Sequence, residues 1–277
     1  MMITSGVNLV LDPIFIFTFD LGINGAALAT ITAFSFGILV VAPRVKKNHW
    51  ATTQWQDLNV VKSVRSIGNI MGPAMISQLL PPLSSMLATK LLAGFGTAAV
   101  AAWALGSRFE FFAIVSVLAL TMSLPPMVGR LRGAKNYDDI QSLVSIAVKF
   151  ILIFQLLIAV ITFAVANPLA LLMTSDIQVE QVLEMHLMIV PISLGSLGVC
   201  MLMVSVCNAL GKSYTALTVS ALRLFVFFLP CLWVGSQIGG IRGLLLGACL
   251  GNICAGIAAY LTYRRTIVML SEMRKAN

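Results

Sequence analysis

Long apolar stretches alternate with short polar connections along the chain. We delimit eight apolar segments, at residues 1–19, 22–43, 67–93, 97–125, 141–166, 182–209, 214–236 and 240–263. Most of them exceed the roughly 18 consecutive apolar residues that are typical of a membrane-spanning helix. The first segment is interrupted at Asp12 and Pro13, because proline cannot continue a regular helix. The pattern predicts an all-α membrane protein with about eight transmembrane helices.

Part of this pattern occurs twice, 218 residues apart. The stretch GINGAAL at 22–28 recurs as GIRGLLL at 240–246, and under the same offset Leu11 falls on Leu229. The first two segments therefore resemble the last two. Six helices separate the copies, so both copies cross the membrane in the same direction. This arrangement indicates a transporter built from two six-helix lobes.

The repeat also predicts the domain organisation. Residues 1–43 would be the last two helices of an incomplete N-terminal lobe, 44–66 a cytoplasmic linker, 67–266 a C-terminal six-helix lobe and 267–277 a cytoplasmic tail. A whole first lobe would need about 150 further residues ahead of Met1. We therefore expect an N-terminally truncated chain whose missing N-terminal lobe is a required partner.

Composition supports the membrane interpretation. The chain is 59% hydrophobic and 10% charged, whereas a soluble domain carries about 25% charged residues. The net charge of +8 does not indicate nucleic-acid binding, because the basic residues are spread between the apolar segments instead of forming one stripe. The five cysteines lie in apolar segments without a CxxC pair, so no disulfide, metal site or cofactor is expected.

The charges of the connections predict the orientation. Thirteen cations fall in alternate connections and the tail: Arg44, Lys46, Lys47, Lys62, Arg65, Arg130, Arg132, Lys135, Lys212, Arg264, Arg265, Arg274 and Lys275. The other connections offer one cation, Arg242, beside Asp20, Asp176 and Glu180. Loops rich in Lys and Arg remain in the cytoplasm. We expect a multi-pass protein of the cell inner (plasma) membrane with its C-terminus in the cytoplasm.

One segment, 97–125, carries two charges near its middle. Glu110 lies 14 residues after Gly96, which is about 21 Å along a helix in a hydrocarbon core about 30 Å thick. A charge at that depth costs about 2.5 to 3.5 kcal/mol. Arg108 cannot easily neutralise Glu110, because residues two apart point to different helix faces. Two interpretations remain: a structural ion pair with Arg223 or Arg108 of a neighbouring helix, or a titratable or cation-binding carboxylate.

Other polar and breaking residues carry weaker signals. Gln78, Pro81 and Pro82 interrupt the segment 67–93, which fits either a hinge that lines a cavity or simple packing. The two histidines, His49 and His186, have no ligand partners nearby in the sequence, so a metal site is not predicted.

Several short motifs together resemble one family. They are NLVLDPIFIF at 8–17, GINGAALAT at 22–30, GTAAVAA at 96–102, Arg108-Phe-Glu110, MVGRLRGAK at 127–135, and NALGK at 208–212 with Ser220, Arg223 and Pro230. The combination is similar to the fifth to eleventh helices of the multidrug and toxic compound extrusion (MATE) transporters, in which many bacterial members carry an R-x-E in the eighth helix. The family's usual GQN reads Gly129-Arg130-Leu131 here, and the seventh-helix glutamate of some members is missing near Pro81.

The resemblance implies a transporter and no enzyme, since no bond is made or broken. We expect a cation-coupled antiporter that exports amphipathic organic cations or drugs in exchange for H⁺ or Na⁺, with a substrate cavity between two lobes. Glu110 is the candidate for cation coupling, and Arg108 and Gln78 are weaker candidates for the cavity lining. The alternatives are a lipid or polysaccharide flippase of related fold and an inactive transporter fragment.

Overall fold

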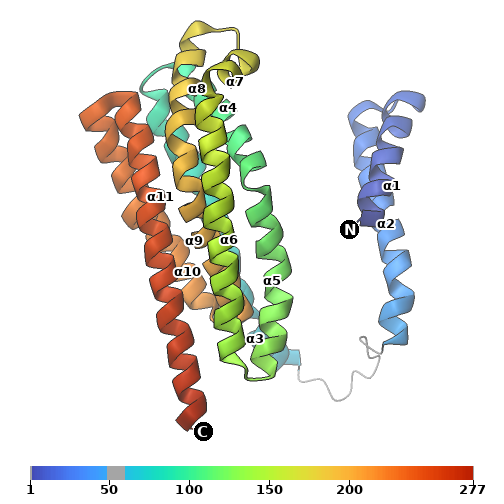
Figure 1. Cartoon of the computed structure of the whole chain (residues 1–277). Helices are drawn as coiled ribbons and strands as arrows, with labels where there is room; N and C mark the ends of the chain where they lie inside the picture. Colours follow the sequence, from blue (N-terminus) through green and yellow to red (C-terminus); the bar gives the residue numbers. More distant parts are fainter. Residues whose placement is uncertain (1, 49–59, 277) are drawn as a thin grey trace. The chain divides into compact units, whose positions relative to one another are not determined.

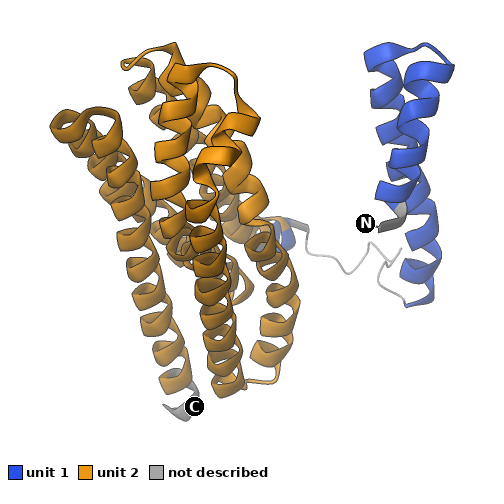
Figure 2. Cartoon of the chain, turned by 45° about the horizontal axis from the view of Figure 1, so that its top comes forward, with its two compact units in different colours: residues 1–63 blue, residues 64–277 orange. Residues whose placement is uncertain are grey.

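The computed structural model describes residues 2–48 and 60–276. Every regular element in these two ranges is helical, which confirms the all-α prediction (Figure 1). The chain forms two compact units, Met1–Ser63 and Val64–Asn277, here called unit 1 and unit 2 (Figure 2). The division falls inside 44–66, the predicted linker. Residues 49–59 of that linker, His49 included, lie outside the described residues.

Unit 1 is a helical hairpin. It consists of α1 (Met2–Pro13), the π-helical turn η1 (Ile14–Thr18) and α2 (Gly22–Lys47). Pro13 does not end the helical path, because the backbone widens into η1 directly after it. The amide of Asn8 donates hydrogen bonds to Asp12 (3.3 Å) and to Thr30 of α2 (3.5 Å), so polar side chains tie the two helices together.

Unit 2 contains the remaining helices. They are α3 (Val60–Ala93), whose first residues still belong to unit 1, α4 (Thr97–Ala113), α5 (Val115–Gly133), α6 (Tyr137–Ala164), α7 (Ala166–Met173), α8 (Ile177–Ile189), the 3-10 turn η2 (Val190–Ser193), α9 (Leu194–Ala209), α10 (Ser213–Ala221), the π-helix η3 (Leu222–Phe228) and α11 (Leu229–Ala276). α11 turns back at Gly239 and Gly240, whose backbone angles are not helical. It then runs to Ala276, so the predicted tail continues the last helix.

The predicted segments correspond to helical paths, several of which are broken. Segment 97–125 comprises α4 and α5, which bend by 47°. In the described part of the chain, four helical stretches are long and apolar enough to cross a membrane, or five if the bent pair α4–α5 is one span. The last of these stretches, Ser213–Glu272, includes the turn at Gly240 and therefore contains two of the predicted segments.

The internal repeat has a structural counterpart. Gly22 and Gly240 occupy equivalent positions and both have positive φ angles, 51° and 57°, which glycine adopts without strain. Gly25 and Gly243 are equivalent as well. A Cβ atom on Gly25 would lie 2.5 Å from the carbonyl oxygen of Phe15, and one on Gly243 would overlap the carbonyl of Gly235. Glycine at these positions lets the two helices of each hairpin approach closely.

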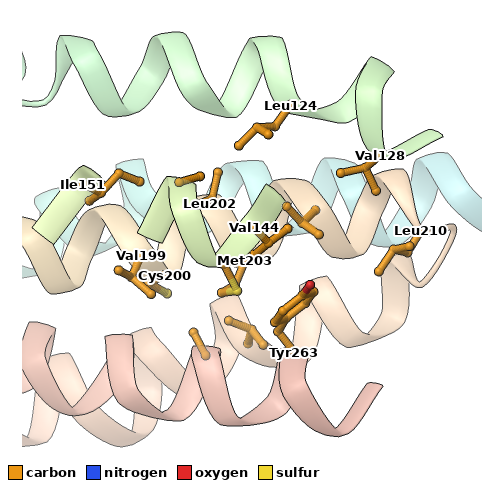
Figure 3. Packing of buried hydrophobic residues seen from close by; sticks show 14 of the residues in the cluster. Leu124, Val128, Val144, Ile151, Val199, Cys200, Leu202, Met203, Leu210 and Tyr263 are labelled. Carbon is orange, nitrogen blue, oxygen red and sulfur yellow. The ribbon is translucent and has the colours of Figure 1, made fainter. Parts of the chain in front are cut away.

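The core of unit 2 is organised around α9. This helix is apolar on nearly all sides, which is typical of a helix surrounded by others. Leu202 and Met203 are fully buried against α5, α6 and α11, as Figure 3 shows. The broken helices α4–α5 and α8–η2–α9 thus pack around a solid apolar centre, and polar side chains gather at the breaks.

The two ends of unit 2 differ in charge. A Cβ atom on Gly211 would lie 2.7 Å from the guanidinium of Arg132, so the basic α5–α6 and α9–α10 connections meet at one end. The α7–α8 connection, with Asp176 and Glu180, lies at the opposite end (Figure 1). This separation agrees with the alternation expected from the sequence. Which end faces the cytoplasm remains a prediction.

Candidate functional site

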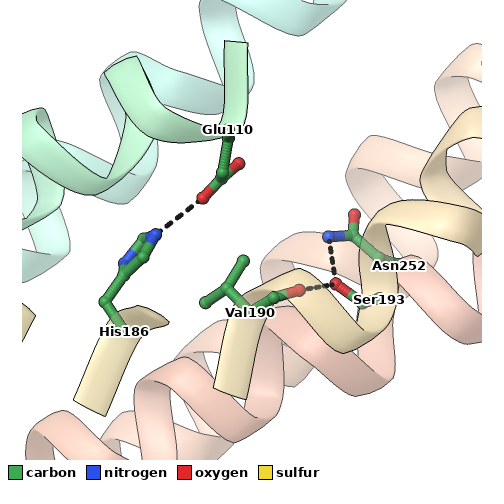
Figure 4. Close-up of polar contacts among 5 residues, drawn as sticks. All are labelled: Glu110, His186, Val190, Ser193 and Asn252. Atoms are coloured by element: carbon green, nitrogen blue, oxygen red, sulfur yellow. Dashed lines mark hydrogen bonds and ion pairs between the residues drawn. The ribbon is translucent and has the colours of Figure 1, made fainter. Parts of the chain in front are cut away.

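Glu110 forms a close contact with a histidine of another helix. It lies in the last turn of α4, and its Oε1 atom is 2.7 Å from Nε2 of His186 in α8 (Figure 4). The His186 side chain is 1% exposed and that of Glu110 is 20% exposed. An ion pair with Arg108 or Arg223, one of the two interpretations left open from the sequence, is not formed, because neither residue lies within ion-pair distance of Glu110. From the sequence, His186 was considered only as a metal ligand, and its pairing with Glu110 was not predicted.

The imidazole of His186 is held on several sides. The Trp103 ring meets it edge to face, with centroids 5.2 Å apart and planes at 80°. Gly106 lies so close that a Cβ atom there would be 2.5 Å from the ring. Nδ1 of His186 and Nε1 of Trp103 are buried without a hydrogen-bond partner. The ring therefore has one hydrogen-bond partner among the described residues, the carboxylate of Glu110.

A break in the helix positions Glu110. Ile114, between α4 and α5, has angles of −91° and 5°, and its N–H donates to the carbonyl oxygen of Glu110 at 2.9 Å. The buried Gln155 of α6 donates through Nε2 to the carbonyl oxygen of Ala113, also at 2.9 Å. This bond satisfies a carbonyl at the end of α4. The carboxylate thus sits at the negative end of a helix dipole, where a proton or a cation is favoured.

A second polar cluster lies at the break between α8 and α9. The hydroxyl of Ser193 donates to the carbonyl oxygen of Val190 (2.8 Å) and accepts from the amide of Asn252 in α11 (3.2 Å), as Figure 4 shows. Oδ1 of Asn252 is buried without a partner. No group of three or more His, Cys, Asp or Glu side chains suited to a metal ion occurs among the residues that the structure describes.

A cavity of about 490 Å³ opens within unit 2, lined by α3, α5, α9, α10 and η3. Its polar lining residues are Ser77, Gln78, Ser84, Thr121, Ser205, Asn208, Ser220 and Arg223. Gln78, expected as a weaker cavity candidate, lies in this lining together with Pro81. Arg108, the other weaker candidate, is exposed elsewhere on α4 and does not line the cavity.

Arg223 is the charged residue of the cavity lining. It lies in η3, a π-helical stretch of the kind that often occurs at functional sites. Its Nε atom is buried without a hydrogen-bond partner, and its guanidinium carbon is 6.0 Å from the centre of the Phe228 ring. From the sequence, Arg223 was expected only as a motif residue and as an ion-pair partner of Glu110. Its place in the cavity depends on how α10 and η3 pack against α3 and α9.

Comparison with known proteins identifies the family. The MatE family model matches residues 73–234. The FAD transporter of Shewanella oneidensis is 30% identical over 275 residues, which are 96% of this chain and 60% of that protein. The multidrug export protein MepA of Staphylococcus aureus is 24% identical over 99% of this chain and 61% of its own length.

The solved structures agree with this match. The crystal structure of the Vibrio cholerae MATE transporter VcmN in the bent form has a TM-score of 0.92 at 66% sequence identity, covering 97% of this chain and 61% of that one. The chain thus spans about three fifths of the length of these relatives. The family match extends over more than half of the chain and coincides with the helices that carry Glu110, His186 and Arg223. The chain is an integral membrane protein that belongs to the MatE family of multidrug and toxic compound extrusion transporters.

Proposed function

We propose that this chain forms part of a proton-coupled antiporter that exports amphipathic organic molecules across the inner membrane. The observation that carries the proposal is the contact between Glu110 and His186 in the interior of unit 2. A carboxylate oxygen and an imidazole nitrogen 2.7 Å apart are joined by a hydrogen bond, and histidine is the side chain whose ordinary charge change falls within the physiological pH range. Of the two expected coupling ions, H⁺ and Na⁺, this pair favours the proton, because sodium requires a shell of oxygen ligands.

The surroundings of the pair suit a coupling step. Glu110 is partly exposed to solvent, whereas His186 is buried with the Glu110 carboxylate as its one hydrogen-bond partner among the described residues. A carboxylate at a helix C-terminus is unfavourable unless a proton or a cation lies beside it. Protonation would therefore bias the bend between α4 and α5, which begins directly after Glu110. Alternating access would then follow by rocking of one lobe against the other.

The substrate class remains part of the proposal. The family resemblance favours amphipathic organic cations. However, one relative is an FAD transporter, and FAD is an anion, whereas another is a multidrug export protein. The orientation is likewise proposed from the charges: the basic connections and the C-terminus would face the cytoplasm.

The test uses the full-length protein in proteoliposomes under separate proton and sodium gradients, with ethidium efflux as the signal. Glu110→Gln and His186→Gln should each lose transport driven by the pH gradient while remaining in the membrane. Glu184→Gln, a carboxylate change on the same helix as His186, is the matched control and should transport normally. A Glu110→Gln protein with the wild-type rate and pH dependence would refute the coupling role. Efflux driven by sodium alone would refute the choice of ion.

A further inference from the structure

We propose that the cavity in unit 2 binds the anionic group of an amphipathic substrate through Arg223. The substrate class would then be molecules that carry a phosphate, sulfonate or carboxylate on an apolar or aromatic body. The inference rests on the proposed function for the export step, whereas the binding itself can be measured independently.

The charge of the cavity lining favours an anionic ligand. Its lining contains Arg223 and no aspartate or glutamate. No acidic side chain of the described residues lies within ion-pair distance of Arg223, and Glu110, a nearby charge, is engaged by His186. A cation that is removed from water without a counter-ion is unfavourable. A bound anion would supply the counter-charge, whereas an organic cation would find no carboxylate in this lining.

The hydrogen-bonding groups around Arg223 also favour an anionic ligand, because they include N–H donors. Its Nε atom is covered by protein yet has no acceptor. The side chains of Gln78 and Asn208 also line the cavity, and each carries an amide NH₂ group that can donate. The hydroxyls of Ser77 and Ser205 already donate to helix carbonyls. Guanidinium and amide N–H groups can therefore converge on one anion, for which the fork of arginine is well suited.

The rest of the cavity lining is mostly apolar and fits the apolar or aromatic body of the ligand. The apolar side chains include Ile70, Leu118, Met122, Met201 and Val204. Methionines adapt to different shapes. A volume of about 490 Å³ lies in the range of sites for small organic molecules. The cavity thus combines one cationic end with a deformable apolar wall, which fits an amphipathic anion better than a bare inorganic ion.

The experiment compares two probes that differ by one phosphate, riboflavin and riboflavin 5′-phosphate, on the full-length protein in lipid nanodiscs. Dissociation constants are measured by quenching of flavin fluorescence. The wild type should bind the phosphorylated probe about tenfold to a hundredfold more tightly, as expected for hydrogen bonds to a charged group. Arg223→Met should abolish this preference and Arg223→Lys should keep part of it. Arg242→Met, a charge removal at an exposed position outside the cavity, should leave it unchanged.

Equal affinity of the wild type for both probes would overturn the proposal, and so would an unchanged preference in Arg223→Met. The first comparison needs no variant, so it decides the question even if Arg223→Met fails to fold. Charge-selective binding without export under a pH gradient would refute the proposed function alone. Proton-driven export of ethidium by a protein without charge selectivity would refute the anion site alone.

Discussion

Replacing Gly106 by alanine should separate Glu110 from His186 without altering either side chain. The added Cβ atom would lie 2.5 Å from Cδ2 and from Nε2 of the imidazole, well inside van der Waals contact. The ring has little room to yield, because it is 1% exposed and meets the Trp103 ring at a centroid distance of 5.2 Å. It must therefore move away from α4, and its Nε2 atom must leave the carboxylate.

The magnitude follows from three contributions. Overpacking of a filled site costs about 1 to 3 kcal/mol. Loss of a hydrogen bond to a charged group costs a further 1.5 to 3 kcal/mol or so. Alanine recovers about 0.5 to 1 kcal/mol relative to glycine in a helix. The free energy of unfolding should fall by about 2 to 5 kcal/mol in Gly106→Ala.

The assay is unfolding of the purified protein in mixed micelles with increasing SDS. Buried thiols such as Cys200 and Cys207 serve as reporters through a thiol-reactive dye. Gly129→Ala is the control, because Gly129 is also in a helix and a Cβ atom there meets nothing within 4 Å. This control should be neutral or slightly stabilising. A double-mutant cycle with His186→Ala supplies the decisive comparison, since removal of the ring frees the space and should cancel the penalty.

Two results would refute this reasoning. One is a Gly106→Ala protein as stable as Gly129→Ala, which would mean that the ring moves at no cost. The other is the same loss of stability with and without His186, which would place the clash elsewhere.

Three further predictions concern the rest of the chain. Reporter fusions at Lys135 and Asn277 should be cytoplasmic and one at Asp176 should lie on the other side, so finding all three on one side would contradict the charge-based topology. Gly247→Ala should destabilise the hairpin of α11 by about 1 to 3 kcal/mol in the same assay, because its Cβ atom would overlap the carbonyl of Cys231. Gly239→Ala is its control, because a Cβ atom at Gly239 meets nothing within 4 Å. An equal loss of stability in the two variants would disprove the close approach of the backbones at Gly247 and Cys231. Asp176→Ala should lower the free energy of unfolding by about 0.5 to 2 kcal/mol, because the carboxylate accepts hydrogen bonds from the N–H groups of the first turn of α8. An unchanged midpoint of SDS unfolding would argue against this helix cap.

The sequence by itself determined the helical paths and the separation of charge between the two ends. These features are local, because a membrane span needs about 20 apolar residues and its flanking loops carry the orientation signal. The repeat was also readable, since Gly22 and Gly240 recur where each hairpin needs a positive φ angle. Glycine marks such positions independently of what packs around them.

Only the tertiary structure decided how the charged residues are used. Glu110 and His186 are 76 residues apart, and nothing in the apolar pattern states that α4 packs against α8. Gln78 and Arg223 line one cavity while Arg108 does not, because the rotation of each helix about its axis decides which face a side chain occupies. In an apolar medium nearly every face of such a helix is hydrophobic, so the sequence carries little information about that rotation.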